Sequence, residues 1–302
     1  MPLLGILGFL VAFAKVGKTT FGYALAAAVA MGRLFLERRT TRLRVLVIAA
    51  EDPPEYVAWL ARHLDVEPGA MTFYRRSLIL TTTGLAQIVH TVKAGGYGFV
   101  LIASWQAVIR GLVKDENDNA GAVCVVEAVK AAARATGVPW LIDAHSGKGE
   151  DQTDDADPSR AMRGASSAAG AADYTLSLRY ANGAFGTQRK LSGRGRFVSL
   201  DPTVMDFDPA TSLYTVMFQG KNAATETTWR LICEMGALTT EPRSAGTIAQ
   251  AAGLVGPDGH TTKTQKRQVA LALVNRDGVL RSEEVRRGGK TWLYRLATEV
   301  AS

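Results

Sequence analysis

The sequence predicts a three-layer α/β domain with a mostly parallel sheet, followed by a small domain of three helices and a β-hairpin. Three observations lead to this prediction. Apolar runs of strand length alternate with helical patterns, which is typical of a parallel sheet covered on both faces. A short loop ending in Gly17-Lys18-Thr19 separates the first apolar run from the first helical pattern. The composition changes over a polar stretch at 219–225, after which helical patterns and basic residues follow.

The elements of the first domain are expected in the following order. Strands are predicted at Ile6–Phe13, Arg44–Ala50, Tyr97–Ala103, Val138–Asp143 and Tyr174–Arg179. Helices are predicted at Lys18–Phe35, Pro54–Leu64 and about Ala120–Thr136. The segment Gln188–Val216 indicates further β structure, with turns at Gly193-Arg194-Gly195 and Asp208-Pro209-Ala210-Thr211. The linker at 219–225 would therefore divide the chain into residues 1–218 and 226–302.

The second domain has start and stop signals for three helices. They are expected at about Glu226–Met235, at Ala245–Ala252 and from Thr262 to Arg276. Ser244 is a candidate N-cap residue, Gly253 a stop signal, and Thr262 and Gln265 have the spacing of a capping box. Strands at Val279–Val285 and Thr291–Leu296 flank a basic tip at residues 286–290, which indicates a β-hairpin. Three helices followed by a basic hairpin are typical of a winged helix-turn-helix.

Composition excludes several classes of protein. The 302 residues are 47% hydrophobic and 21% charged, as in a globular domain and unlike a disordered chain. Two cysteines exclude a disulfide framework and a four-cysteine zinc module; both lie in apolar helical patterns, so we expect them in the core. The apolar stretch from Pro2 to Ala14 lacks a preceding positive charge and is too short to cross a bilayer. We therefore expect a cytoplasmic protein, and the early first strand leaves open a segment upstream.

Positive charge is concentrated near the C-terminus. The formal net charge is +7, and residues 261–295 contain nine Lys and Arg against three Asp and Glu, a local excess of +6. A basic surface gathered in one region indicates a polyanionic partner. The alternative is a solvated charged face without a partner.

The strongest chemical signal is the segment Ala12-Phe13-Ala14-Lys15-Val16-Gly17-Lys18-Thr19. Between a strand and a helix, such a loop is a P-loop, whose backbone N–H groups and helix N-terminus form an anion cradle. Lys18 would reach the β- and γ-phosphates, and the Thr19 hydroxyl would bind Mg²⁺. Ala12 replaces the usual first glycine. We therefore predict ATP and Mg²⁺ as cofactors. The predicted nucleotide-binding residues are Ala14, Lys15, Val16, Gly17, Lys18, Thr19 and Thr20.

Six short motifs extend this signal along the chain. They are Lys15-Val16-Gly17-Lys18-Thr19-Thr20, Ala49-Ala50-Glu51-Asp52-Pro53, Asp115-Glu116-Asn117-Asp118-Asn119-Ala120, His145-Ser146-Gly147-Lys148-Gly149, Arg163-Gly164-Ala165-Ser166-Ser167-Ala168 and Gly193-Arg194. In order and spacing they resemble the RepA-type hexameric replicative helicases, a family of RecA-like P-loop AAA ATPases. The resemblance covers roughly residues 5 to 216.

The resemblance implies roles for three further residues. Glu51 would be the general base that activates the attacking water, although an acid before Pro53 can also serve a helix N-terminus, a role that fits Asp52 better. His145 would sense the γ-phosphate. Arg194 would be an arginine finger that reaches the nucleotide of a neighbouring subunit, with Lys190 and Arg196 as alternatives or as solvated cations.

The chain departs from the family pattern at two positions. Where the family has an aspartate that holds Mg²⁺ through water, this chain has Ala103, and a methyl group cannot orient a hydrated metal. Where the family has an apolar residue, this chain has Asp143, on the strand expected next to the P-loop strand and on the same side as His145. We hypothesise that Asp143 supplies the missing carboxylate. The alternative is weak or absent hydrolysis.

Two sets of basic residues are candidates for binding DNA. The long polar loop Glu150–Ser167 corresponds to loops that line the central channel in RecA-like hexamers and contact single-stranded DNA. Lys148, Arg160 and Arg163 could make this contact, although acids in the first half of the loop oppose contact with phosphates. In the second domain, Lys263, Lys266 and Arg267 lie on the helix expected to enter the major groove, and Arg286, Arg287 and Lys290 lie at the hairpin tip. The alternative for this domain is protein contact alone.

The sequence therefore predicts a RecA-like P-loop ATPase core followed by a winged helix, assembled as a homo-oligomer, expected to be a hexamer. Its partners would be single-stranded DNA at the core and double-stranded DNA at the winged helix. The expected function is that of a RepA-like helicase or helicase-like replication ATPase of a plasmid, phage or mobile element. A nucleotide-switched DNA-binding regulator is an alternative that Ala103 favours. A recombinase-like or KaiC-like ATPase is a further alternative, which the second and fifth motifs disfavour.

Overall fold

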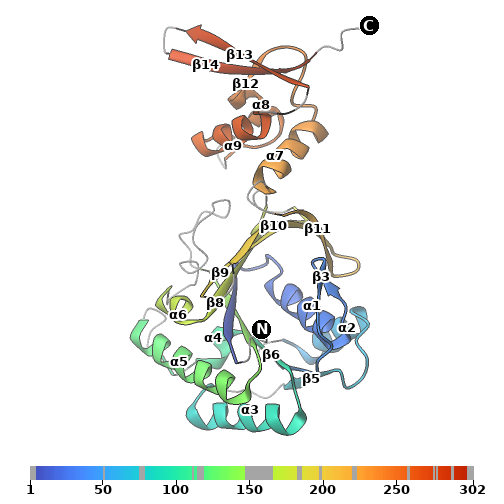
Figure 1. Ribbon diagram of the computed structural model, residues 1–302, viewed down its shortest axis with the longest axis vertical. Coiled ribbons are helices and arrows are strands. Elements are labelled where there is room, and N and C mark those ends of the chain that lie inside the picture. Colours follow the sequence, from blue (N-terminus) through green and yellow to red (C-terminus); the bar gives the residue numbers. More distant parts are fainter. Residues whose placement is uncertain are drawn as a thin grey trace. The chain divides into compact units, whose positions relative to one another are not determined.

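The chain forms two compact units, Met1–Met217 and Phe218–Ser302 (Figure 1). The computed structural model describes residues 5–49, 52–74, 79–110, 112–113, 119–146, 166–181, 186–196, 199–219, 223–256, 259–274, 276, 278–286 and 289–297. The predicted linker at 219–225 follows the division between the units directly. Each unit is considered by itself below.

Unit 1 is built on a large sheet. In the described part of the chain this sheet has nine strands in the order β11-β10-β9-β8-β1-β7-β6-β4-β5. They are β1 (Leu7–Ala12), β4 (Val45–Ala49), β5 (Met71–Tyr74), β6 (Phe99–Ala103), β7 (Trp140–His145), β8 (Tyr174–Tyr180), β9 (Gln188–Gly195), β10 (Ser199–Asp208) and β11 (Leu213–Gln219). From β5 to β8 neighbouring strands are parallel, whereas β8, β9 and β10 pair antiparallel.

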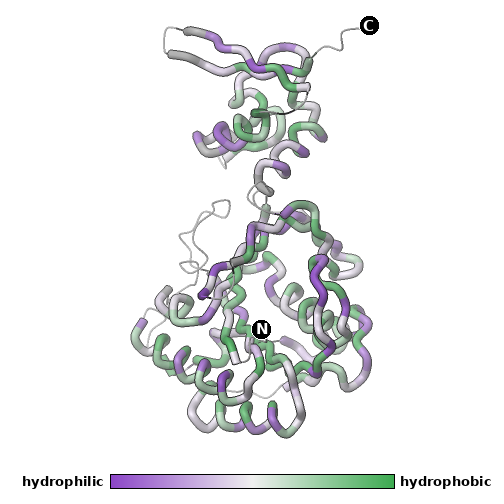
Figure 2. Tube along the Cα trace, viewed as in Figure 1, coloured by the Kyte–Doolittle hydropathy of each residue, from purple (hydrophilic) through white to green (hydrophobic). Residues whose placement is uncertain are grey.

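Helices cover both faces of this sheet. One apolar core joins the sheet to α3 (Thr82–Gly95), α4 (Trp105–Val108), α5 (Asn119–Thr136) and α6 (Ser166–Ala171). The other core joins it to α1 (Lys18–Met31) and α2 (Pro54–His63). Figure 2 shows hydrophobic residues along the central strands and hydrophilic patches on the surrounding helices. The predicted α/β class with a mostly parallel sheet is confirmed, and β7 lies beside β1 as expected.

Two local predictions were wrong for identifiable reasons. The first helix ends at Met31 rather than Phe35, because Gly32 adopts a φ of 65° and the chain turns into the short strands β2 (Leu34–Phe35) and β3 (Arg38–Arg39). The expected turn at Gly193-Arg194-Gly195 lies inside β9. A Cβ at position 195 would stand 2.5 Å from the Asp173 carbonyl oxygen, so this glycine permits close strand packing rather than a turn.

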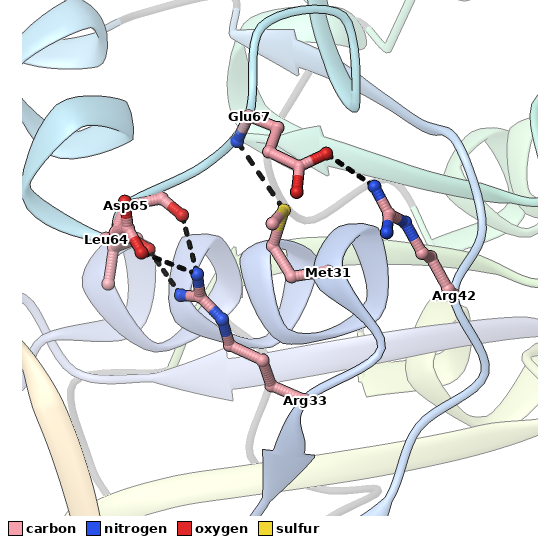
Figure 3. Close-up of polar contacts among 6 residues, drawn as sticks. All are labelled: Met31, Arg33, Arg42, Leu64, Asp65 and Glu67. Carbon is pink, nitrogen blue, oxygen red and sulfur yellow. Dashed lines mark hydrogen bonds and ion pairs between the residues drawn. The ribbon is translucent and has the colours of Figure 1, made fainter.

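The segment after α1 is held at the surface by two arginines (Figure 3). Arg33 donates to the Leu64 carbonyl at 2.9 Å and to the Asp65 carboxylate at 2.8 Å, and Arg42 forms an ion pair with Glu67. The Glu67 amide also contacts the Met31 sulfur at 3.5 Å. Exposed pairs of this kind each contribute little to stability, so their effect is to fix the path between α1 and β4.

Unit 2 contains three helices and a small antiparallel sheet. The helices are α7 (Ala223–Glu234), α8 (Ala245–Ala251) and α9 (Lys263–Leu273), and the strands, in sheet order, are β12 (Arg243–Ser244), β14 (Gly289–Leu296) and β13 (Val279–Arg286). Ile232, Ile248, Val269 and Tyr294 form the centre of its core. The predicted Ser244 N-cap, the Thr262–Gln265 capping box and the β-hairpin are all confirmed.

Neither cysteine lies in a core. Cys124 on α5 and Cys233 on α7 are both exposed, so the expectation of core packing was wrong. On α5 the sheet-facing side is formed by Ala122, Val126 and Val129, which leaves Cys124 on the solvent side of an amphipathic helix. Among the helices in the described ranges, none has the length and apolar character needed to cross a membrane.

Candidate functional site

The P-loop lies at the carboxyl end of β1 and leads into α1. Lys15 has a φ of 68° and Gly17 a φ of 98°, so two left-handed residues alternate with their neighbours. Such alternation turns successive N–H groups toward one concave side and forms an anion nest. Gly17 is also the N-cap residue of α1, and no side-chain cap occupies this helix end in the described structure. The N–H groups of the first turn can therefore receive an anion.

Lys18 is paired with the carboxylate that the sequence singled out. Its Nζ lies 3.2 Å from Asp143 Oδ1, and the two side chains are only 7% and 1% exposed. Asp143 lies on β7, in register with Leu10 of β1. A buried carboxylate is costly without a cation beside it, so Lys18 stabilises Asp143 in this state of the site.

Ala103 ends β6 as a buried methyl group, 4% exposed. In the register of β6 and β7, Ile102 pairs with Ile142, so Ala103 and Asp143 follow at the same level on adjacent strands. The carboxylate therefore stands one strand closer to β1 than the family pattern has it. That Asp143 supplies the carboxylate absent at Ala103 remains a prediction.

His145 also lies beside the start of the P-loop. It ends β7 in register with Ala12, and the Ser146 amide donates to the Ala12 carbonyl at 3.0 Å. The His145 side chain is partly exposed, two residues beyond Asp143 on the same strand. The structure thus brings Lys18, Asp143 and His145 together at the carboxyl ends of β1 and β7.

Asp52 contacts α1 rather than capping α2. The Tyr23 hydroxyl donates to Asp52 Oδ2 at 2.8 Å, while Pro53 is the N-cap residue of α2 and Glu55 the acid of its first turn. Burial, and then the nearby carboxylates of Asp52 and Asp143, raise the pKa of Tyr23 far above its ordinary value. The residue predicted as general base, Glu51, lies outside the described residues.

Arg194 lies on β9, two strands away from β1 in the sheet. It is an exposed residue of β9, in register with Thr175 of β8, which in turn pairs with Phe9 of β1. Arg194 therefore lies at the level of Phe9, three residues before the carboxyl end of β1 and farther from the P-loop. Lys190 pairs with Arg179 and stands closer to the level of the loop.

Three side chains that the sequence analysis missed contact the P-loop backbone. The Tyr180 hydroxyl donates to the Lys15 carbonyl at 3.1 Å, Arg189 Nε to the Val16 carbonyl at 2.7 Å, and the Tyr214 hydroxyl to the Gly17 carbonyl at 3.3 Å. Burial raises the pKa of Tyr214 and lowers that of Arg189 from their ordinary values. These residues could have been found as basic or tyrosine residues on the sheet face toward α1. To know which residues of β8 to β11 lie on that face, however, one needs the register of those strands.

The residues of this edge fit a nucleoside triphosphate with Mg²⁺. The nest, the α1 N-terminus and Lys18 suit phosphate oxygens, whereas Thr19 and Asp143 offer the oxygen ligands that Mg²⁺ prefers. Thr19 and Thr20 are partly exposed in the first turn of α1, and Ala14 and Lys15 are exposed in the loop. Among the described residues, no group of three or more His, Cys, Asp or Glu is placed to hold a metal ion by itself.

Two of the other motif segments meet at the surface of unit 1. The Ser167 hydroxyl donates to Asn119 Oδ1 at 2.8 Å, which joins the start of α6 to the start of α5. In the chain, α5 follows β6 and α4, and α6 follows β7. Lys148 and Arg163, predicted to contact single-stranded DNA, lie outside the described residues.

The basic residues of α9 lie together in its first two turns. Lys263, Lys266 and Arg267 are all exposed, and the stem of Lys266 lies over Gly246 of α8, where an added Cβ would stand 3.2 Å from Lys266 Cε. In the hairpin, β13 ends at Arg286 and β14 begins at Gly289. Arg287 and the side chains of Arg286 and Lys290 lie outside the described structure.

Comparisons with known proteins agree with this architecture. The family described as an AAA domain matches residues 2–151. A KaiC-like protein from the hyperthermophilic archaeon Pyrococcus horikoshii superimposes with a TM-score of 0.52 at 12% sequence identity, over 71% of this chain and 90% of that chain. No curated protein matches the sequence. Unit 1 therefore has a RecA-like P-loop ATPase fold, and most of its first 151 residues are similar to the AAA-domain family. At this identity the likeness concerns the fold and does not separate RepA-like from KaiC-like ATPases.

Proposed function

We propose that the protein is a DNA-associated ATPase that binds and hydrolyses ATP with Mg²⁺ in unit 1 and binds duplex DNA through unit 2. Within this class we propose a RepA-like replicative helicase or helicase-like replication protein of a plasmid, phage or mobile element. The observation that carries the proposal is the buried Lys18–Asp143 pair beside the P-loop nest.

The pair supports nucleotide binding through charge. Lys18 neutralises Asp143 at 3.2 Å. When Lys18 turns to the phosphates, Asp143 needs another cation, and Mg²⁺ bound to the nucleotide supplies one. Removing one partner of a buried pair costs about 3–5 kcal/mol, so an ATP complex without a metal would be strongly disfavoured. Nucleotide affinity should therefore depend on Mg²⁺.

Hydrolysis is proposed to use the same edge of the sheet. When bound, Mg²⁺ would neutralise charge on the transferring phosphoryl group. Thr19 and Asp143 would hold the metal, His145 would contact the γ-phosphate, and Glu51 would accept the proton of the attacking water. The position of His145 beside Ala12 supports its part in this assignment.

The DNA-binding proposal rests on unit 2. Its three helices and three-stranded sheet support a winged helix-turn-helix, with α9 as the helix that enters the major groove. Lys263, Lys266 and Arg267 are exposed on the N-terminal half of α9, where recognition helices contact DNA. Single-stranded DNA is proposed to bind the core through Lys148 and Arg163.

A ring of subunits would account for Arg194. Its side chain is exposed and lies away from the P-loop of its own chain, as expected of a residue that completes a neighbouring site. We propose a homo-oligomer, with a hexamer as the expected form. Light scattering after size exclusion, with and without ATP and Mg²⁺, measures the subunit number; a monomer under both conditions would contradict this proposal.

The direct test is ATP turnover with and without single-stranded DNA, together with strand displacement on forked and blunt duplexes. A helicase hydrolyses ATP faster with single-stranded DNA and displaces a strand only with hydrolysable ATP. Stimulated turnover without displacement would leave a DNA-associated ATPase and exclude the helicase.

A second candidate is a nucleotide-switched DNA-binding regulator, which Ala103 favours. It predicts tight ATP binding with almost no turnover, and duplex affinity that changes when ATP is added. Turnover equal to that of an active ATPase, with duplex affinity independent of nucleotide, would exclude this candidate.

A further inference from the structure

The side of the P-loop that faces away from the phosphate nest is held by three consecutive hydrogen bonds. The carbonyls of Lys15, Val16 and Gly17 accept from Tyr180, Arg189 and Tyr214 at 3.1, 2.7 and 3.3 Å. The three donors come from β8, β9 and β11, which belong to the β8–β11 end of the sheet rather than to the strands that carry the loop.

Arg189 is the centre of this arrangement. Its side chain is 7% exposed and donates to three carbonyls, those of Val16, Gly186 and Gln188. Its guanidinium also lies 4.2 Å from the centre of the Tyr180 ring and 5.7 Å from that of Phe207. Arginine remains charged in proteins, so a buried cation stands directly behind the phosphate nest.

Tyr214 is fixed by packing as well as by its hydroxyl. Its ring centre lies 5.2 Å from that of Phe21 on α1 and 5.0 Å from that of Phe207 on β10. A Cβ at position 17 would lie 3.4 Å from the Tyr214 hydroxyl, so glycine leaves room for this approach. Tyr214 therefore ties the first residue before α1 to the edge strand β11.

We propose that Tyr180, Arg189 and Tyr214 are positioning residues of the nucleotide site, which hold the P-loop in its phosphate-binding conformation. This inference rests on the proposed binding of ATP. The Val16 N–H donates to the Phe13 carbonyl at 3.4 Å. The N–H groups of Gly17 and Lys18 share trans peptide bonds with the held carbonyls of Val16 and Gly17, so they point to the opposite side, where the phosphates would lie. Fixing the loop before binding reduces the ordering cost of the complex, and the buried charge of Arg189 adds to the attraction for an anion.

The tyrosines are tested by removing the hydroxyl alone. Tyr214→Phe and Tyr180→Phe keep the rings and delete one hydrogen bond each, so affinity for ATP with Mg²⁺ should fall about 3- to 10-fold. Inorganic triphosphate, which contacts the loop without a base or sugar, should lose affinity by the same factor. Tyr97→Phe is the matched control, because Tyr97 lies before the amino end of β6, at the opposite edge of the sheet.

Arg189 is tested by two substitutions. Arg189→Met should weaken ATP and triphosphate binding about 10- to 100-fold, since it removes a charge-assisted bond and the charge itself. Arg189→Lys restores the positive charge and should therefore recover part of the lost affinity. If Arg189 had only a structural role, restoring the charge would not raise the affinity for triphosphate. Arg44→Met is the control, because Arg44 lies 4.9 Å from the Tyr97 ring centre and resembles the Arg189–Tyr180 pair in geometry.

The outcomes separate this inference from the proposed function. If the parent binds ATP, Lys18→Ala does not, and the tyrosine variants bind both probes as the parent does, then the positioning role is wrong while the ATP site stands. The positioning role is also wrong if affinity falls only in proportion to a lowered Tm that the controls share. If the parent binds neither ATP nor triphosphate, the proposed function and this inference fail together.

Discussion

The two regions that gather positive charge use it in opposite ways. In unit 1, Lys18 and Arg189 are each 7% exposed and held by named partners, whereas in unit 2 Lys263, Lys266 and Arg267 lie in solvent on α9. A buried cation has one geometry and suits one anion in one position. An exposed cation adapts, and several together bind a polyanion by releasing counterions. The difference teaches that burial, more than charge count, separates the cations at the P-loop from those on α9.

The largest effect is expected at the buried cation of the P-loop. Lys18→Ala should abolish ATP binding, because it removes the charge that meets the β- and γ-phosphates while the backbone nest remains. Calorimetry should show no measurable heat of ATP binding. Circular dichroism should show a core that is folded but has a lower Tm than the parent, because Asp143 loses its buried cation. Binding as tight as that of the parent would remove the P-loop from the account.

A loss of turnover without loss of binding is expected at the predicted general base. Glu51→Gln should lower kcat about 10²- to 10⁴-fold, because an amide cannot accept the proton of the attacking water. ATP affinity should stay within a few-fold of the parent, and a steady-state assay beside a binding assay measures both. Unchanged turnover would take Glu51 out of the mechanism.

The exposed cations should behave additively and respond to salt. Replacing Lys263, Lys266 and Arg267 by Gln should weaken duplex binding and lower the slope of log K against log salt concentration by about 0.9 for each lost phosphate contact. ATP binding should remain that of the parent. A chain ending at Gln219 should likewise keep the ATPase and lose duplex affinity. Undiminished binding in both variants would reassign unit 2 to protein contact.

The smallest effect is expected at a buried hydroxyl, and it depends on pH. Tyr23→Phe deletes the hydrogen bond to Asp52 and should cost about 1 kcal/mol at pH 7. Because burial raises the folded-state pKa of Tyr23 above its ordinary value of about 10, its contribution is present below pH 10 and is lost as pH rises beyond it. Urea unfolding at pH 7 and pH 11 should show a smaller alkaline loss in Tyr23→Phe than in Tyr97→Phe.

Local signals predicted the centre of the site well. Gly17-Lys18-Thr19 between a strand and a helix sufficed to predict the loop. The apolar run before Asp143 predicted a strand, and the strand order expected of a RecA-like fold placed that strand beside β1, as the structure has it. The element pair β5 and α3 was missed, because Met71–Tyr74 is short and α3 begins with Thr82-Thr83-Gly84, residues of weak helical preference.

The contacts behind the P-loop could not be predicted from local patterns. Arg189 and Val16 are 173 residues apart, and Tyr214 and Gly17 are 197 apart. Their meeting depends on the antiparallel return of β9, β10 and β11, whose register includes an irregularity between Leu200 and Thr203. In the sequence, the two glycines of β9 are typical of a turn. Their role in close packing becomes visible only from the residues that surround them in three dimensions.

The most direct test of the central claim, that Asp143 replaces the carboxylate missing at Ala103, is ATP hydrolysis measured against Mg²⁺ concentration in a carboxylate exchange. Asp143→Asn should lower turnover and raise the Mg²⁺ concentration needed for half-maximal rate. Ala103→Asp alone should change the rate little, since two carboxylates would then share one metal. The double variant, Ala103→Asp with Asp143→Asn, should recover rate and Mg²⁺ dependence. If Asp143→Asn alters neither quantity, or Ala103→Asp alone raises the parent rate strongly, Asp143 is not the metal carboxylate and the account of the site is contradicted.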